Sequence, residues 1–84
     1  MTESGLDQAR RHVAEAEQRV AEQLERIEWL RIEGLDTRAA EKLYAAFKKT
    51  LQSMRDHLVY EEQRERDRQR REGRSRAFPQ DQSL

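Results

Sequence analysis

The chain has 84 residues, 40% of them charged and 35% hydrophobic, and its 17 basic residues balance 17 acidic ones. This length fits one domain at most, and the zero net charge excludes a whole-molecule field that would draw the chain onto nucleic acid or an anionic membrane. The absence of cysteine excludes disulfides, thiolate catalysis and cysteine-ligated metal centres. No apolar run approaches the ~18 residues of a membrane span, and the first residues lack the features of a signal peptide. We therefore expect a cytoplasmic protein without membrane contact.

A first helix is predicted for about residues 5–33. Ser4 precedes it and is a suitable N-cap, with the carboxylate of Asp7 three residues later near the positive end of the helix. Apolar residues then recur at helical spacing and form one stripe. They are Leu6, Ala9, Val13, Ala16, Val20, Leu24, Ile27 and Leu30.

Gly34 ends this helix, because glycine adopts the left-handed conformation of a C′ residue without steric cost. Leu35 can then pack back on Leu30 in a Schellman motif, and Asp36 or Thr37 can cap the next helix. A connection this short makes two helices antiparallel neighbours.

A second helix is predicted for about residues 37–70. Its apolar face carries Ala40, Leu43, Tyr44, Phe47, Leu51, Met54 and Leu58. The core of the hairpin is expected to consist of Val20, Ile27, Leu43, Phe47, Leu51 and Met54. No segment has the β-branched and aromatic pattern of strands. The fold class is therefore all-α, an antiparallel two-helix hairpin.

The composition changes after residue 60. Residues 61–76 contain seven arginines and five acidic residues, and no apolar side chain. We expect residues 1–60 to form the hairpin, 61–76 an Arg-rich helical extension that frays towards Gly73, and 77–84 a disordered tail.

One such hairpin gathers little core, so pairing into a homodimeric four-helix bundle is expected. The predicted surface for a second copy or another protein includes Trp29 and Ile32 near the turn, and small residues beside the apolar face of the second helix. The full set is Trp29, Ile32, Ala39, Ala46, Phe47, Leu51 and Met54. Two alternatives remain open: Trp29 covers its own turn, and the alanines serve helix propensity alone.

The two histidines suggest a metal site. His12 and Glu15 share a face of the first helix, as His57 and Glu61 do on the second, so four ligands would converge if facing residue numbers sum to roughly 70. The alternative is that both histidines are border residues of the apolar stripe. Paired imidazoliums at this position would also make the dimer sensitive to pH.

The Arg-rich segment suggests phosphate contacts with nucleic acid. The candidate residues are Arg64, Arg66, Arg68, Arg70 and Arg71. Interleaved acids weaken the local field, and no aromatic residue is interleaved to stack on bases. A solvated helix end explains the same composition.

The stretch from His12 to Glu61 resembles short uncharacterised helical-hairpin proteins of α-proteobacteria. The resemblance rests on E-x-L-R-x-E-G-L-D-T-R-A-A-E-K-L around the turn and on the later L-Q-S-M-R-D-H-L. It implies a hairpin and brings no activity with it. In outline the chain is also similar to the small RNA-binding hairpin dimers of plasmid copy control, although it shares no motif with them.

No Gly-rich phosphate loop, metalloprotease motif or nucleophile–base set is present in the sequence. The prediction is a non-enzymatic, cofactor-free interaction or regulatory protein that acts as a homodimer through its helix faces. A nucleic-acid-binding regulator and a metal-binding bundle are the alternatives.

Overall fold

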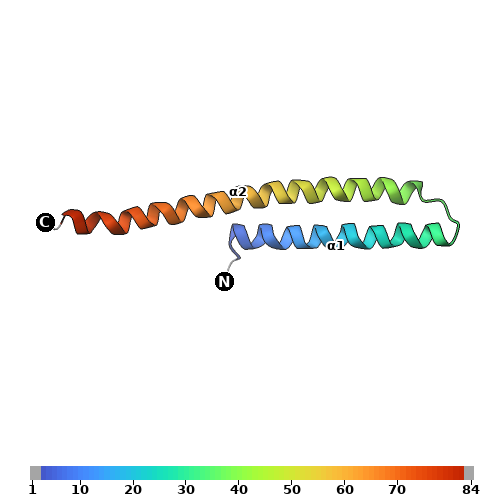
Figure 1. The fold of residues 1–84 in the computed structure, drawn as a ribbon, viewed down its shortest axis with the longest axis horizontal. Helices are drawn as coiled ribbons and strands as arrows, with labels where there is room; N and C mark the ends of the chain where they lie inside the picture. Colours follow the sequence, from blue (N-terminus) through green and yellow to red (C-terminus); the bar gives the residue numbers. More distant parts are fainter. Residues whose placement is uncertain (1–2, 83–84) are drawn as a thin grey trace.

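The computed structural model describes the backbone of residues 3–82 and the side chains of residues 3–73. Two helices, α1 (Gly5–Ile32) and α2 (Arg38–Gln82), run antiparallel and pack against each other (Figure 1). The predicted all-α hairpin is therefore confirmed. Its dimensions are 79 × 23 × 16 Å and its radius of gyration is 21.4 Å, against about 12 Å for a compact domain of this length. The molecule is an elongated rod.

The start of α1 follows the capping prediction. The backbone amide of Asp7 donates a hydrogen bond of 3.0 Å to Oγ of Ser4, which satisfies one of the amides left free at a helix N-terminus. The Asp7 carboxylate lies in the first turn, where the helix dipole favours negative charge.

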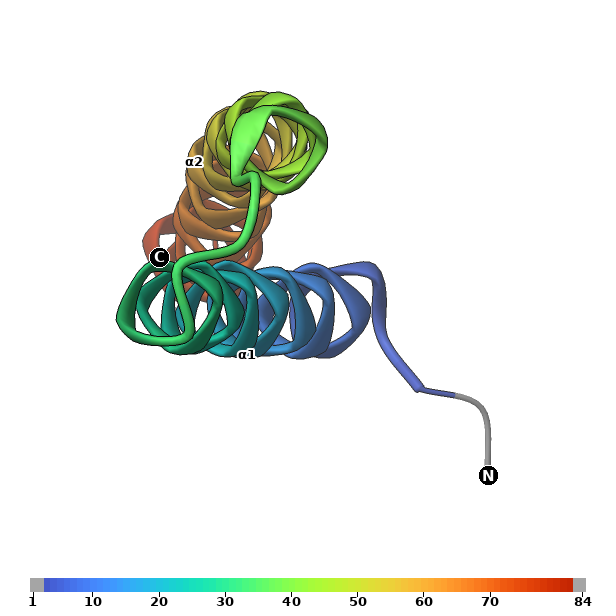
Figure 2. The ribbon, with the colours of Figure 1, turned by 90° about the vertical axis from the view of Figure 1, so that its right-hand side faces the viewer.

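The turn is a Schellman motif. Gly34 has a φ of 72°, its amide donates to the carbonyl of Arg31 at 3.1 Å, and the amide of Leu35 donates to the carbonyl of Leu30 at 2.8 Å. These two bonds satisfy carbonyls that would otherwise be free at the end of α1. Figure 2, a view from the turn, shows the connection crossing from one helix end to the other.

Asp36 caps α2. Its Oδ1 atom accepts from the backbone amide of Arg38 at 3.0 Å, and its carboxylate also pairs with the Arg38 guanidinium at 2.8 Å. The carbonyl of Thr37 accepts from the amide of Glu41 and so begins the helical ladder. Of the two predicted caps, the side-chain role belongs to Asp36.

The cap makes the stability of the hairpin depend on pH. The side-chain hydrogen bonds from Arg38, and then its backbone amide, lower the pKa of Asp36 below its ordinary value of 3.8. A carboxyl whose pKa is lowered by folding stabilises the fold above that value, and this stabilisation is lost as the pH falls through the folded pKa. Asp36→Asn is expected to melt below wild type at neutral pH, with the difference shrinking in strong acid. A difference in melting temperature that stays constant down to strong acid would contradict the assignment.

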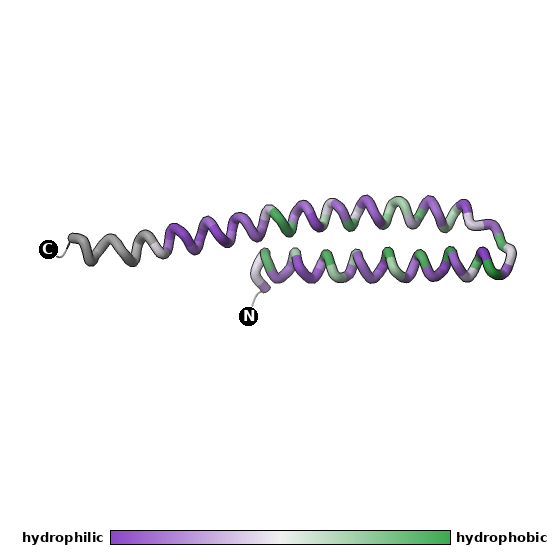
Figure 3. Tube along the Cα trace, in the orientation of Figure 1, coloured by the Kyte–Doolittle hydropathy of each residue, from purple (hydrophilic) through white to green (hydrophobic). Residues whose placement is uncertain are grey.

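The core follows a strict alternation of three- and four-residue steps on both helices, the pattern of a coiled-coil seam (Figure 3). Val13, Ala16 and Leu51 form its centre, with Val20, Met54 and Leu58 packed around them. The buried hydrophobic residues are Ala9, Val13, Ala16, Ile27, Ala40 and Leu51. No large side chain is fully buried among the described residues, so the core is thin.

The prediction is wrong for one core residue, Leu43. Leu43 is 46% exposed, because it lies beside the seam rather than on it. At the corresponding level of α1 the seam position is taken by Gln23, which is buried and donates from Nε2 to the carbonyl of Ala40 at 2.9 Å. A polar side chain therefore holds the two helices together near the turn.

The register of the helices differs from the predicted one. Glu61 lies against Gly5, where an added Cβ would come within 3.0 Å of Oε2 of Glu61. With a facing sum of roughly 70, Gly5 would instead have lain opposite a residue about one turn later in α2. The shift arises because residues 35–37 are non-helical and run back along α1 before α2 begins (Figure 1).

α2 continues beyond the predicted end near residue 70, to Gln82. Arg68 forms ion pairs with Glu65 and Glu72, three and four residues away, and such pairs support a helix that has no partner to pack on. About 21 residues of α2 lie past Glu61, a projection of about 32 Å at 1.5 Å per residue. The whole tail predicted at 77–84 lies where side chains are not described, and residues 83–84 lie outside the described structure. No helix in the described part is long and apolar enough to cross a membrane.

Two glycines give opposite predictions. Gly34→Ala is expected to destabilise the protein by about 1–2 kcal/mol, because a Cβ is strained at a φ of 72°. Gly73→Ala, inside α2 with nothing within 4 Å of the added Cβ, is expected to stabilise it slightly or raise its helicity. Thermal unfolding followed by circular dichroism measures both. A Gly34→Ala variant as stable as wild type would contradict the left-handed turn. A Gly73→Ala variant that is less stable than wild type would contradict the helical extension.

Candidate interaction surfaces

The turn end of the hairpin carries a patch of exposed apolar side chains. Trp29 is 56% exposed, Ile32 is 82% exposed, and Leu35 is also exposed; these three residues are called the turn patch. Trp29 and Ile32 lie on the exposed side of α1, as predicted. Their role in binding stays a prediction.

The other predicted interface residues divide into two groups. Ala39 and Ala46 are exposed on α2 and available to a partner. Leu51 is buried between α1 and α2, so its side chain belongs to the core of the hairpin and not to its surface. Phe47 and Met54 are half-buried, with one side towards α1. The sequence could not separate the two groups because both fall on the apolar half of α2.

The four predicted metal ligands do not come together as one group. Within the described residues, no cluster of three or more His, Asp or Glu side chains could hold a metal ion. Nε2 of His57 lies 3.6 Å from Oε1 of Glu61, whereas Glu15 pairs with Arg11 at 3.5 Å. His12 lines a surface hollow with Thr50 and Met54. His57 lies on an exposed flank of α2 beside the contact with α1, whereas His12 is half-buried next to Met54, so the two pairs of side chains stay apart.

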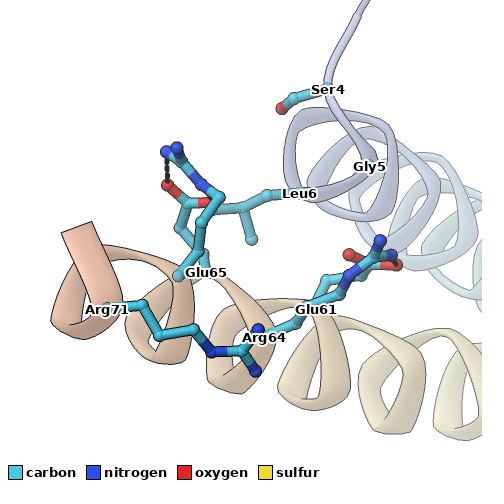
Figure 4. Close-up of a pocket in the computed structure, with 8 residues that line it drawn as sticks. Ser4, Gly5, Leu6, Glu61, Arg64, Glu65 and Arg71 are labelled. Atoms are coloured by element: carbon cyan, nitrogen blue, oxygen red, sulfur yellow. Dashed lines mark hydrogen bonds and ion pairs between the residues drawn. The ribbon is translucent and has the colours of Figure 1, made fainter. Parts of the chain in front are cut away.

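The arginine segment meets the start of α1 at an open hollow of about 390 Å³ (Figure 4). The hollow is lined by Ser4, Gly5, Leu6, Glu61, Arg64, Glu65, Arg68 and Arg71. Of the five predicted arginines, the fold thus gathers Arg64, Arg68 and Arg71 on one side. Arg66 instead contacts Gln63, and Arg70 lies 3.9 Å from Asp67.

Acidic side chains share this hollow with the arginines. Arg68 donates to Glu65 at 2.6 Å, and this hydrogen bond lowers the pKa of Glu65. The contacts of Arg68 with Glu65 and then with Glu72 raise the pKa of Arg68. Glu61, only 12% exposed, lies 4.0 Å from Arg64. The guanidinium charge is therefore largely matched within the chain, which leaves less of it for phosphate.

Some surface and packing residues were missed by the sequence reasoning. Val59 and Tyr60 are exposed on α2, and Tyr60 stacks on His57 with ring centroids 6.2 Å apart. Gln23 is the polar residue in an otherwise apolar heptad stripe of α1. Its position in that stripe is the sequence signal that predicts its burial. Glu61 occupies a seam position of α2, so strict heptad counting would also have placed it against α1.

Comparisons with family models, curated proteins and solved structures found no match for the chain.

Proposed function

We propose that this chain is a small non-enzymatic interaction protein that acts as a homodimer through the outer faces of its hairpin. One observation carries the proposal: the described residues expose more large hydrophobic side chains than they bury. The large hydrophobic side chains that are buried are Val13, Ile27 and Leu51, whereas those that are exposed are Leu24, Trp29, Ile32, Leu35, Leu43, Val59 and Tyr60. Exposed apolar side chains in such number favour a contact surface.

The surface area points the same way. The accessible surface is 7188 Å², against about 5,300 Å² expected for a compact monomer of 10.1 kDa. Part of the surplus belongs to the projecting end of α2. A second hairpin would cover apolar surface that one hairpin leaves in water.

The shape of the molecule supports binding rather than catalysis. The hollows in the described part are open to solvent, and none of the titratable groups with shifted pKa values lies in an enclosed site. The lack of cysteine suits a reducing compartment such as the cytoplasm. The nucleic-acid alternative has less support, because the acids around Arg68 already pair with it.

The concentration dependence of thermal unfolding tests the proposal. A folded dimer gains stability by mass action, by about 2.7 kcal/mol for a hundredfold rise in concentration. The melting temperature is therefore expected to rise with protein concentration. A melting temperature that is independent of concentration over this range would show that one hairpin folds alone and would contradict the homodimer.

A further inference from the structure

One flank of α2 carries no charged side chain from Ala39 to Tyr60. Its residues alternate in steps of four and three, so they lie on one side of the helix, next to the seam that packs on α1. We call this flank the outer seam, and it consists of Ala39, Leu43, Ala46, Thr50, Ser53, His57 and Tyr60. All seven residues are exposed, and their side chains are apolar or uncharged polar when His57 is neutral.

We propose that the outer seam is the dimer contact: α2 of one copy packs antiparallel on α2 of a second copy, seam to seam, about a twofold axis near Thr50 and Ser53. This inference rests on the homodimer proposed above and assigns its geometry. Small side chains at the middle of the seam allow two helices to approach closely, while Leu43 and Tyr60 add apolar area towards the ends. The hydroxyl of Thr50 donates to the carbonyl of Ala46 at 3.2 Å, so its burial leaves no free donor.

The neighbouring flank of α1 is a poor alternative for the second copy. On the same side of the hairpin, Arg19, Glu22 and Arg26 line the groove beside Phe47, and Arg19 also lines the hollow beside Thr50. An apolar surface laid over these side chains would remove their charges from water at high cost. Pairing α2 with α2 buries the uncharged outer seam and leaves the charged flank of α1 exposed to solvent.

Charge complementarity selects the register. In an antiparallel pairing with Thr50 opposite the partner's Ser53, Lys49 lies beside the partner's Asp56, and the same pair forms twice by symmetry. A shift by one heptad would instead bring Lys49 next to the partner's Lys49. Lys49 and Asp56 are both exposed and lie at the edge of the outer seam.

The same register also extends the core. It places Leu43 opposite the partner's Tyr60, and half-buried Phe47 beside the partner's Met54. Two side chains that each hairpin covers on one side only are then covered on the other side by the second copy.

Glutamate substitution of two neighbouring alanines tests whether the outer seam is the dimer contact. Ala46→Glu places two charges inside the proposed contact and is expected to raise the dimer dissociation constant at least about a hundredfold. Ala45→Glu, the same change one residue away and off the seam, is the matched control and is expected to change it less than about threefold. Helicity at high concentration shows that both variants fold. Equal effects of the two variants would overturn the seam.

Charge reversal tests the register. Lys49→Glu and Asp56→Lys are each expected to weaken the dimer about tenfold, and the double variant to restore it to within about threefold of wild type. The two residues are seven apart, about 10.5 Å along one helix, so they cannot pair within a chain. Restoration therefore reports a contact between copies, and additive weakening would overturn the register.

A distance measurement separates the remaining geometries. Because the chain has no cysteine, Arg66→Cys accepts a single spin label on an exposed site. The proposed register separates the two labels by about 44 Å along the axis, and one-heptad shifts in the two directions by about 54 Å and about 33 Å. A parallel pairing leaves them under about 20 Å apart. A monomeric wild type would overturn both the homodimer and the seam, whereas a dimer with another label distance would overturn the seam alone.

Discussion

Leu51→Ala is expected to destabilise the hairpin by about 2–5 kcal/mol, the largest effect of a single truncation in this chain. Leu51 is buried and belongs to the central cluster with Val13 and Ala16. Because the core contains no fully buried large side chain, Leu51 supplies a large share of the apolar surface that the hairpin buries. A protein with a stability at the low end of ~5–15 kcal/mol would keep at most about 3 kcal/mol after this loss.

Urea denaturation measures this effect, and Leu24→Ala is the matched control. Leu24 is 41% exposed on α1, and its truncation is expected to cost less than about 1 kcal/mol. A second variant tests the packing directly: Ala16→Leu in the Leu51→Ala background returns volume to the same cluster and is expected to recover part of the loss. Equal costs for the Leu51 and Leu24 variants would contradict the observed core.

Gln23→Glu is expected to destabilise the protein by about 1–3 kcal/mol although the two side chains have the same shape. The Gln23 amide donates to the carbonyl of Ala40 from a buried position, and an ionised carboxylate cannot donate. Burial of a carboxylate beside a carbonyl oxygen adds a desolvation cost.

Gln23→Leu is the control for this prediction. Leucine fills similar space without a polar group to satisfy, and the Ala40 carbonyl can still accept from the amide four residues on in its own helix. The free energy of unfolding from urea titration is expected to stay within about 1.5 kcal/mol of wild type. A glutamate variant as stable as wild type would show that the Gln23 bond does not hold the helices together.

Local signals in the sequence predicted most of the fold. Ser4 and Gly34 mark helix ends by chemistry that acts within a few residues, so the cap and the Schellman motif could be read directly. The end of α2 was harder to predict, because the contacts between Arg68 and its acidic neighbours support a helix without any apolar pattern.

The register could not be predicted from the turn alone. It depends on how the short connection runs back along α1, and an error of about one turn was enough to misplace the residues that face His12. Gln23 and Glu61 both occupy seam positions, where a polar side chain reads as an interruption of the pattern. Their contacts with Ala40 and Gly5 became clear only with both helices in place.

The candidate surfaces were predictable only in part. Exposure of Trp29 and Ile32 follows from their angular position on α1, far from Ile27. For α2 the distinction between core and outer seam is a rotation of about 100°, one residue's step around the helix. Leu51 and Ala46 fall on opposite sides of that division, which helical periodicity alone did not resolve.

Sedimentation equilibrium tests the proposed homodimer most directly. One chain has a mass of 10.1 kDa. Self-association predicts about twice that mass at high concentration, falling towards the mass of one chain on dilution as the helical signal is lost. A mass of one chain at every concentration, with the helical signal intact, would contradict the proposal that the hairpin functions as a pair.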